Sequence, residues 1–83
     1  MEDQLRGILE DVGGLAAPVA TIGSDQDLFA AGLTSFATVS VMLAIEDGFD
    51  VEFPDRLVNR ATFRTIGTLV AVITQLQSDP LAA

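Results

Sequence analysis

The sequence predicts an all-α fold, a small bundle of three longer helices with a short third helix before the last one. Three stretches carry apolar residues at three- and four-residue steps, the spacing that places them on one face of a helix. Glycine and proline separate these stretches. The 83 residues suffice for one modest core. We therefore expect a single domain over 1–77 and a flexible tail over 78–83, where Pro80 prevents further helix.

The first helix is predicted over residues 2–15. Four apolar residues recur on one side of it, and acidic residues occupy the other: Leu5, Ile8, Leu9 and Val12. Gly13 and Gly14 weaken its end. Residues 16–34 have no sustained period and are rich in Ala, Gly, Pro and Asp, which favours a long first loop. Leu28 and Phe29 are expected to anchor that loop on the core.

The second helix is predicted over residues 35–47, with Gly48 as its C-terminal stop. Its apolar residues form two lines on neighbouring faces. One line holds Val41, Ile45 and, just past the end, Phe49; the other holds Phe36, Val39 and Leu43. A helix that is apolar on two faces is either central in its bundle or presents one face to a partner.

The short third helix is predicted over residues 55–60, after a loop that contains Pro54. Thr62 is the expected N-cap of the last helix, which should run to about Gln77. Six apolar residues recur there at helical spacing: Phe63, Ile66, Leu69, Val70, Ile73 and Leu76.

Twelve acidic residues face four arginines and no lysine, so the net charge is −8. This charge repels nucleic acid and anionic membrane surfaces and favours basic protein partners. The chain has no cysteine, and its N-terminus lacks the basic and apolar regions of a secretory signal. Residues 28–45 are uncharged, but Gly32 and several hydroxyl residues interrupt them, so we reject a membrane span. A cytoplasmic location is expected.

The composition argues against catalysis. The chain has no His, Lys, Cys or Tyr, so the usual bases that activate a serine are missing. We therefore expect neither a serine hydrolase nor any other enzyme. The acids between 47 and 55 do not follow the order of an EF-hand loop, and no metal site is predicted.

Ser35 is the residue that we expect to carry the function. It opens the second helix after a glycine turn at Gly32. The unpaired N–H groups and the positive dipole end of a helix N-terminus would tolerate a phosphodiester on this hydroxyl. A serine in this place is most often just an N-cap, and in that role Ser35→Ala would cost about 1 kcal/mol.

Two patterns surround this serine: D-L-F-x-x-G-L-x-S-F over residues 27–36, and an acidic and apolar run over residues 45–55. Together they resemble the acyl carrier protein and peptidyl carrier protein family over about residues 5–77. The resemblance implies a four-helix bundle. It also implies that a phosphopantetheinyl transferase attaches 4'-phosphopantetheine from coenzyme A to Ser35. The thiol of this arm then holds an acyl or aminoacyl group as a thioester for delivery to partner enzymes.

Two departures from the family pattern bear on its partners. Many members have Asp before the modified serine, where this chain has Thr34, and this affects which transferase acts. Fatty-acid carriers show several acids on the recognition helix, where this chain has Ala37 and Ser40. Apolar contact should therefore dominate recognition. The expected partner-binding residues are Phe36, Val39, Ser40, Leu43 and Asp47. In the alternative interpretation, the three apolar residues of this set are core.

Within the family, residues 32–37 and 44–55 look most like small stand-alone bacterial carriers. The resemblance implies loading with glycine or alanine by an amino acid:carrier protein ligase, whose catalytic core resembles that of a seryl-tRNA synthetase. The alternative that a different, acyl-loading enzyme charges the carrier stays open. A downstream acceptor enzyme is expected to receive the cargo. The carrier should be monomeric. The alternative function is a non-catalytic acidic helical module that binds a protein while Ser35 stays unmodified.

Overall fold

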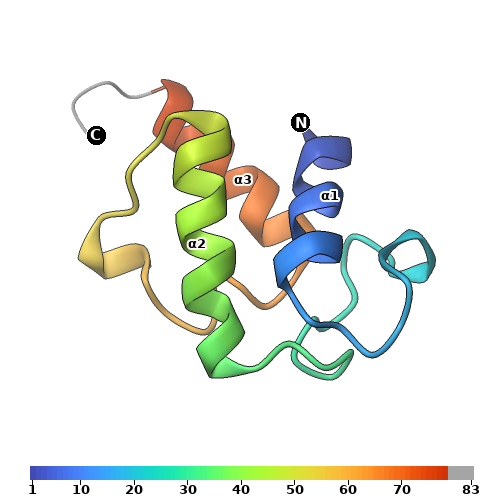
Figure 1. The fold of residues 1–83 in the computed structure, drawn as a ribbon. Coiled ribbons are helices and arrows are strands. Elements are labelled where there is room, and N and C mark those ends of the chain that lie inside the picture. Colours follow the sequence, from blue (N-terminus) through green and yellow to red (C-terminus); the bar gives the residue numbers. More distant parts are fainter. Residues whose placement is uncertain (79–83) are drawn as a thin grey trace.

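The computed structural model describes residues 1–78, which contain three α-helices, two 3-10 turns and no strand (Figure 1). The chain order is α1 (Glu2–Val12), η1 (Val19–Thr21), α2 (Ser35–Phe49), η2 (Asp55–Leu57) and α3 (Ile66–Ser78). α1 packs against both α2 and α3. The predicted all-helical fold is confirmed. No helix within 1–78 combines the length and apolar character needed to cross a membrane.

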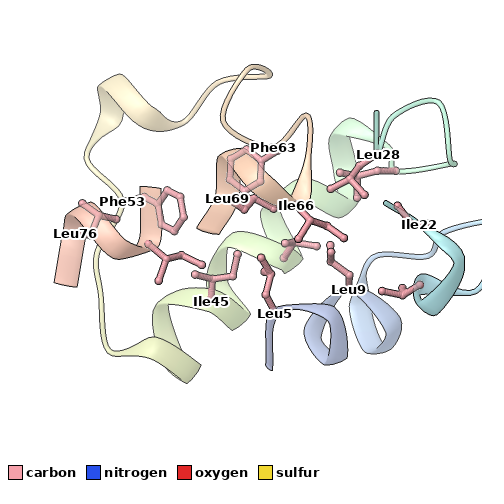
Figure 2. Close-up of a cluster of buried hydrophobic side chains, with 14 residues drawn as sticks. Leu5, Leu9, Ile22, Leu28, Ile45, Phe53, Phe63, Ile66, Leu69 and Leu76 are labelled. Atoms are coloured by element: carbon pink, nitrogen blue, oxygen red, sulfur yellow. The ribbon is translucent and has the colours of Figure 1, made fainter. Parts of the chain in front are cut away.

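One hydrophobic core joins the three helices and both long loops (Figure 2). Burial of each large aliphatic side chain stabilises the fold by about 1.5–3 kcal/mol. The buried apolar residues are Leu5, Leu9, Val19, Ile22, Leu28, Leu33, Val41, Ile45, Phe53, Phe63, Ile66, Leu69, Ile73 and Leu76. Five of them come from the loops rather than from a helix or turn: Ile22, Leu28, Leu33, Phe53 and Phe63.

α1 ends earlier than predicted, at Val12 instead of residue 15. Gly13 caps the helix by donating its N–H to the Leu9 carbonyl, and Gly14 then turns the chain with a φ of 63°. Glycine adopts this left-handed conformation without the steric cost of a Cβ atom. The expectation that Val12 lies on the core face was wrong, because its side chain is 38% exposed.

The loop from residue 13 to 34 is attached to the core through Leu28 and Phe29, as predicted. Leu28 is fully buried and Phe29 is half-buried. The Leu28 N–H donates to the Arg64 carbonyl at 2.7 Å. Arg6 adds a second attachment that the sequence pattern did not predict, because its guanidinium donates to the carbonyls of Val19 and Ile22 at 2.9 and 2.8 Å.

α2 continues past the predicted stop to Phe49. Gly48 lies inside the helix, and its carbonyl accepts a hydrogen bond from the Gln4 side chain at 2.9 Å. Asp50 ends the helix instead, with a left-handed φ of 55°. Aspartate tolerates this conformation better than most residues, which explains how the helix ends without a glycine there.

The predicted short helix over 55–60 is only the η2 turn, so the described residues contain three α-helices and not four. Asn59 interrupts the segment, because its side-chain oxygen accepts the Thr62 N–H at 2.9 Å. The last helix begins at Ile66, four residues after Thr62, so the predicted N-cap role of Thr62 was also wrong.

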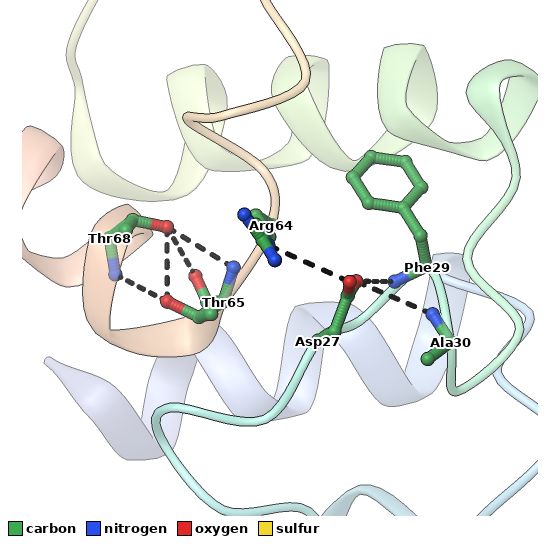
Figure 3. A network of polar contacts seen from close by, with 6 residues as sticks. All are labelled: Asp27, Phe29, Ala30, Arg64, Thr65 and Thr68. Atoms are coloured by element: carbon green, nitrogen blue, oxygen red, sulfur yellow. Dashed lines mark hydrogen bonds and ion pairs between the residues drawn. The ribbon is translucent and has the colours of Figure 1, made fainter.

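Thr65 caps α3. Its hydroxyl accepts the Thr68 N–H at 3.0 Å, and the Thr68 hydroxyl accepts the Thr65 N–H at 3.2 Å (Figure 3). Such a reciprocal pair satisfies two otherwise unpaired donors at a helix start. Ser78, which was expected in the tail, is the last residue of α3. The rest of the expected tail, including Pro80, lies outside the described residues.

Candidate functional site

The loop from residue 27 presents Ser35 as the first residue of α2. Thr34, not Ser35, is the N-cap: its backbone is extended and its hydroxyl accepts the Ala37 N–H at 3.0 Å. The alternative that Ser35 serves only as the N-cap of the helix was therefore wrong. Leu33 is buried immediately before this pair, which anchors the start of the helix on the core.

The Ser35 hydroxyl is free in the described part of the chain. The residue is exposed, and its side chain makes no hydrogen bond within residues 1–78. Its carbonyl accepts a bond from the Thr38 hydroxyl at 2.6 Å. Because Ser35 stands at the positive end of the α2 dipole, a negative group on its oxygen is favoured electrostatically.

A groove of about 270 Å³ opens beside Ser35. Three segments converge on it: the first loop, the start of α2 and the chain after η2. Its lining residues are Phe29, Ser35, Thr38, Val58, Asn59, Arg60 and Phe63. None of them is a carboxylate, so this lining offers no general base for the serine.

The sequence did not point to Phe29, Val58, Asn59 and Arg60 as neighbours of Ser35. Arg60 places its guanidinium carbon 3.9 Å from the centroid of the Phe29 ring. These two residues are far apart along the chain, and each lies in a segment without a periodic pattern that would place its side chain. Only the folded loops bring them together.

The predicted partner-binding residues all lie at the surface of α2. Phe36 is 86% exposed, Val39 53% and Leu43 55%. We call these three residues the apolar strip. Ser40 and Asp47 are also exposed, and their spacing from the strip keeps them on the same side of the helix. The alternative that the three apolar residues are core is excluded.

The site thus consists of an exposed serine at the start of a helix, with a groove beside it. The family model described as "Phosphopantetheine attachment site" matches residues 3–73, and the chain belongs to this family. The resemblance found in the sequence is confirmed. Family membership implies a 4'-phosphopantetheine prosthetic group and a carrier function.

Individual relatives agree with this assignment. The chain is 53% identical to an aminoacyl carrier protein of Agrobacterium fabrum over 66 residues, which are 80% of each chain. It also matches a solved structure of an engineered Bradyrhizobium japonicum glycine:carrier protein ligase complexed with a carrier protein from Agrobacterium tumefaciens and AMP. That match has a TM-score of 0.87 and 47% identity, and it covers 89% of this chain and 99% of the other.

A third match is the solution structure of a holo acyl carrier protein from Nitrosomonas europaea. Its TM-score is 0.83 and its identity is 30%, over 94% of this chain and 96% of the other. The features of this chain fit the prosthetic group that the family carries. The free Ser35 hydroxyl offers an attachment point, and the groove offers one guanidinium and no competing carboxylate.

Proposed function

We propose that Ser35 is the residue that bears the 4'-phosphopantetheine arm. The observation that carries this proposal is its exposed hydroxyl, which is free of hydrogen bonds within residues 1–78 because Thr34 takes over the capping role. In a reaction catalysed by a phosphopantetheinyl transferase, the serine oxygen bonds to the pantetheine-bearing phosphorus of coenzyme A and the phosphoanhydride bond breaks. Adenosine 3',5'-bisphosphate leaves, and the serine proton is lost to a base of the transferase or to water. The arm brings a thiol to a chain that has no cysteine.

The proposed cargo is an aminoacyl group, held as a thioester on that thiol. The aminoacyl carrier protein of Agrobacterium fabrum supports this choice, since it is 53% identical to this chain. The carrier protein that was solved with a glycine:carrier protein ligase supports an amino acid:carrier protein ligase as the loading enzyme. A downstream acceptor enzyme then receives the cargo.

We further propose that the loading enzyme docks on α2, across the apolar strip and the adjoining Ser40 and Asp47. The strip exposes three large apolar side chains on one side of one helix. Contact surfaces bury such residues at their centre and leave polar and charged residues at the rim. Ser35 lies at the N-terminal end of the same helix, so a docked enzyme would have the arm within reach.

The remaining parts of the proposal concern the whole chain. It acts as a monomeric, non-catalytic, cytoplasmic carrier with one domain over 1–77. The η2 turn is the proposed counterpart of the short third helix in the family's four-helix bundle, because it occupies the same place in the order of elements.

Incubation with coenzyme A and a broad-specificity transferase tests the attachment site. Intact mass spectrometry should show one added phosphopantetheinyl group on the wild type and none on Ser35→Ala. Ser24→Ala is the matched control, because it removes another exposed serine hydroxyl outside the groove and should still be modified. Equal modification of the wild type and of Ser35→Ala would refute the proposed site.

A further inference from the structure

The groove beside Ser35 contains one charged side chain, that of Arg60. The chain as a whole carries a net charge of −8, and no acid is among the residues that line the groove. A negative group at Ser35 therefore meets a local environment whose charge is opposite to that of the molecule. This complementarity points to an anionic occupant.

Arg60 differs from two other arginines of the chain in having no anionic partner. Arg6 pairs with Glu2 at 3.0 Å, and Arg64 pairs with Asp27 at 3.6 Å (Figure 3 shows the second pair). Within residues 1–78 the Arg60 guanidinium forms no ion pair and donates no hydrogen bond. Its charge is thus available to a ligand.

The Phe29 ring holds the Arg60 guanidinium beside the groove. The cation lies 3.9 Å from the ring centroid, well inside the distance of about 6 Å that defines a cation–π contact. Phe29 is itself fixed, since its N–H donates to the Asp27 side chain at 2.9 Å (Figure 3). A guanidinium stacked in this way keeps its N–H donors available, and their planar fork matches the oxygens of a phosphate group.

Apart from the free Ser35 hydroxyl, the other polar side chains of the groove already form hydrogen bonds. The Thr38 hydroxyl donates to the Ser35 carbonyl. The Asn59 amide donates to the Arg56 carbonyl, while its oxygen accepts from Thr62. Arg60 is consequently the one side chain of the lining that combines free donors with a positive charge.

We infer that Arg60 pairs with the phosphodiester of the arm and is a positioning residue for it. This inference rests on the proposed attachment at Ser35. The pair holds the first part of the arm against the groove, with the Phe29 ring as the support for the cation. Because Arg60 is exposed, the pair is weak and salt-sensitive, and a docked enzyme can release it.

Nuclear magnetic resonance of the apo and holo protein tests this inference. The Arg60 Nε–H proton reports the guanidinium, and the ³¹P resonance reports the phosphodiester. On attachment of the arm, exchange of the Arg60 Nε–H with water should slow by about two- to fivefold at low salt, as expected for an exposed ion pair. The effect should disappear at about 1 M salt, where charges are screened beyond about 3 Å.

Arg60→Gln and Arg56→Gln form a matched pair of variants. Both remove one positive charge, but Arg56 does not line the groove. The ³¹P resonance should shift between low and high salt in the wild type and in Arg56→Gln, and this shift should be absent in Arg60→Gln. Equal ³¹P behaviour in the two variants would overturn the inference.

The apo and holo comparison of the wild type needs no variant and keeps the inference testable if Arg60→Gln is poorly folded. A fully modified protein with unchanged Arg60 exchange overturns the pairing alone. A protein that gains no phosphopantetheinyl mass contradicts the proposed function instead. Mass measurement of each sample before the resonance experiment distinguishes the two results.

Discussion

Thr34 and Ser35 divide two roles within the first turn of α2. Thr34 caps the helix through its hydroxyl, which leaves the Ser35 hydroxyl exposed for the proposed modification. The pattern around Ser35 predicts that this residue is the modified one. It did not distinguish which hydroxyl residue caps the helix, because Ser and Thr are both favoured at that position. Arg60 was not predicted, since its contact with Phe29 depends on how two loops fold.

This division of roles predicts different costs for two neighbouring substitutions. Thr34→Ala removes the cap and should lower the free energy of unfolding by about 1 kcal/mol. Ser35→Ala removes no hydrogen bond found in residues 1–78 and should change it by less than about 0.5 kcal/mol. Urea unfolding followed by circular dichroism measures both. A larger loss for Ser35→Ala than for Thr34→Ala would show that the serine caps the helix after all.

Gly32 is predicted to be sensitive to any side chain. Its φ is 113°, and an added Cβ atom would lie 2.9 Å from the Ala16 nitrogen. Gly32→Ala should therefore destabilise the fold by about 1–3 kcal/mol. Gly7→Ala is the control, since nothing lies within 4 Å of its added Cβ, and it should stabilise α1 by about 0.5–1 kcal/mol. Thermal unfolding of the two variants should shift in opposite directions, and a shift in the same direction would contradict this account.

At the scale of elements, α2 buries one face and exposes another. Val41 and Ile45 are fully buried, whereas the apolar strip stays in solvent. The sequence predicted both lines of apolar residues correctly. It predicted the ends of the helices less accurately. The helices end where the local backbone geometry at Gly13 and Asp50 allows, and composition does not specify that geometry. The length of the third helix was overestimated because of another local contact. The Asn59 side chain accepts the Thr62 N–H, and this hydrogen bond replaces helical ones.

The exposed strip predicts a docking defect without a folding defect. Leu43→Glu places a charge on a side chain that is 55% exposed, so circular dichroism and attachment of the arm should stay unchanged. Loading by the partner ligase should fall, because the charge would be desolvated at the contact. Val12→Glu on α1 is the control, at 38% exposure, and should load normally. Loss of the fold in Leu43→Glu, or equal loading of both variants, would contradict docking on α2.

At the scale of the whole molecule, the fold depends on loops that close over a small core. The sequence predicted one helical domain and the anchoring of the first loop by Leu28. The contribution of Phe53 to the core was not predicted, although its ring stacks on that of Phe63 with centroids 5.7 Å apart. Phe53 lies in a segment without helical periodicity, where no pattern indicates which side chains turn inward. Phe63 was predicted on the apolar face of the last helix; it is buried as expected, but it lies in the segment before α3.

Leu28 tests whether the loop and the helices unfold together. Leu28→Ala should lower the free energy of unfolding by about 2–5 kcal/mol, because it leaves a cavity in the core. Leu43→Ala, at an exposed position, should change it by less than about 0.5 kcal/mol. Urea unfolding measures both variants. Similar small changes would mean that the loop is not part of the cooperative core.

The central claim, that this chain is a carrier modified on Ser35, is tested most directly on the protein isolated from its native host. Intact mass spectrometry, followed by mapping of the peptide that contains Ser35, measures the modification as it occurs in the cell. We predict the mass of the chain plus one phosphopantetheinyl group, located on Ser35. An unmodified Ser35, with the arm absent or on another residue, would contradict the claim and favour a protein-binding module instead.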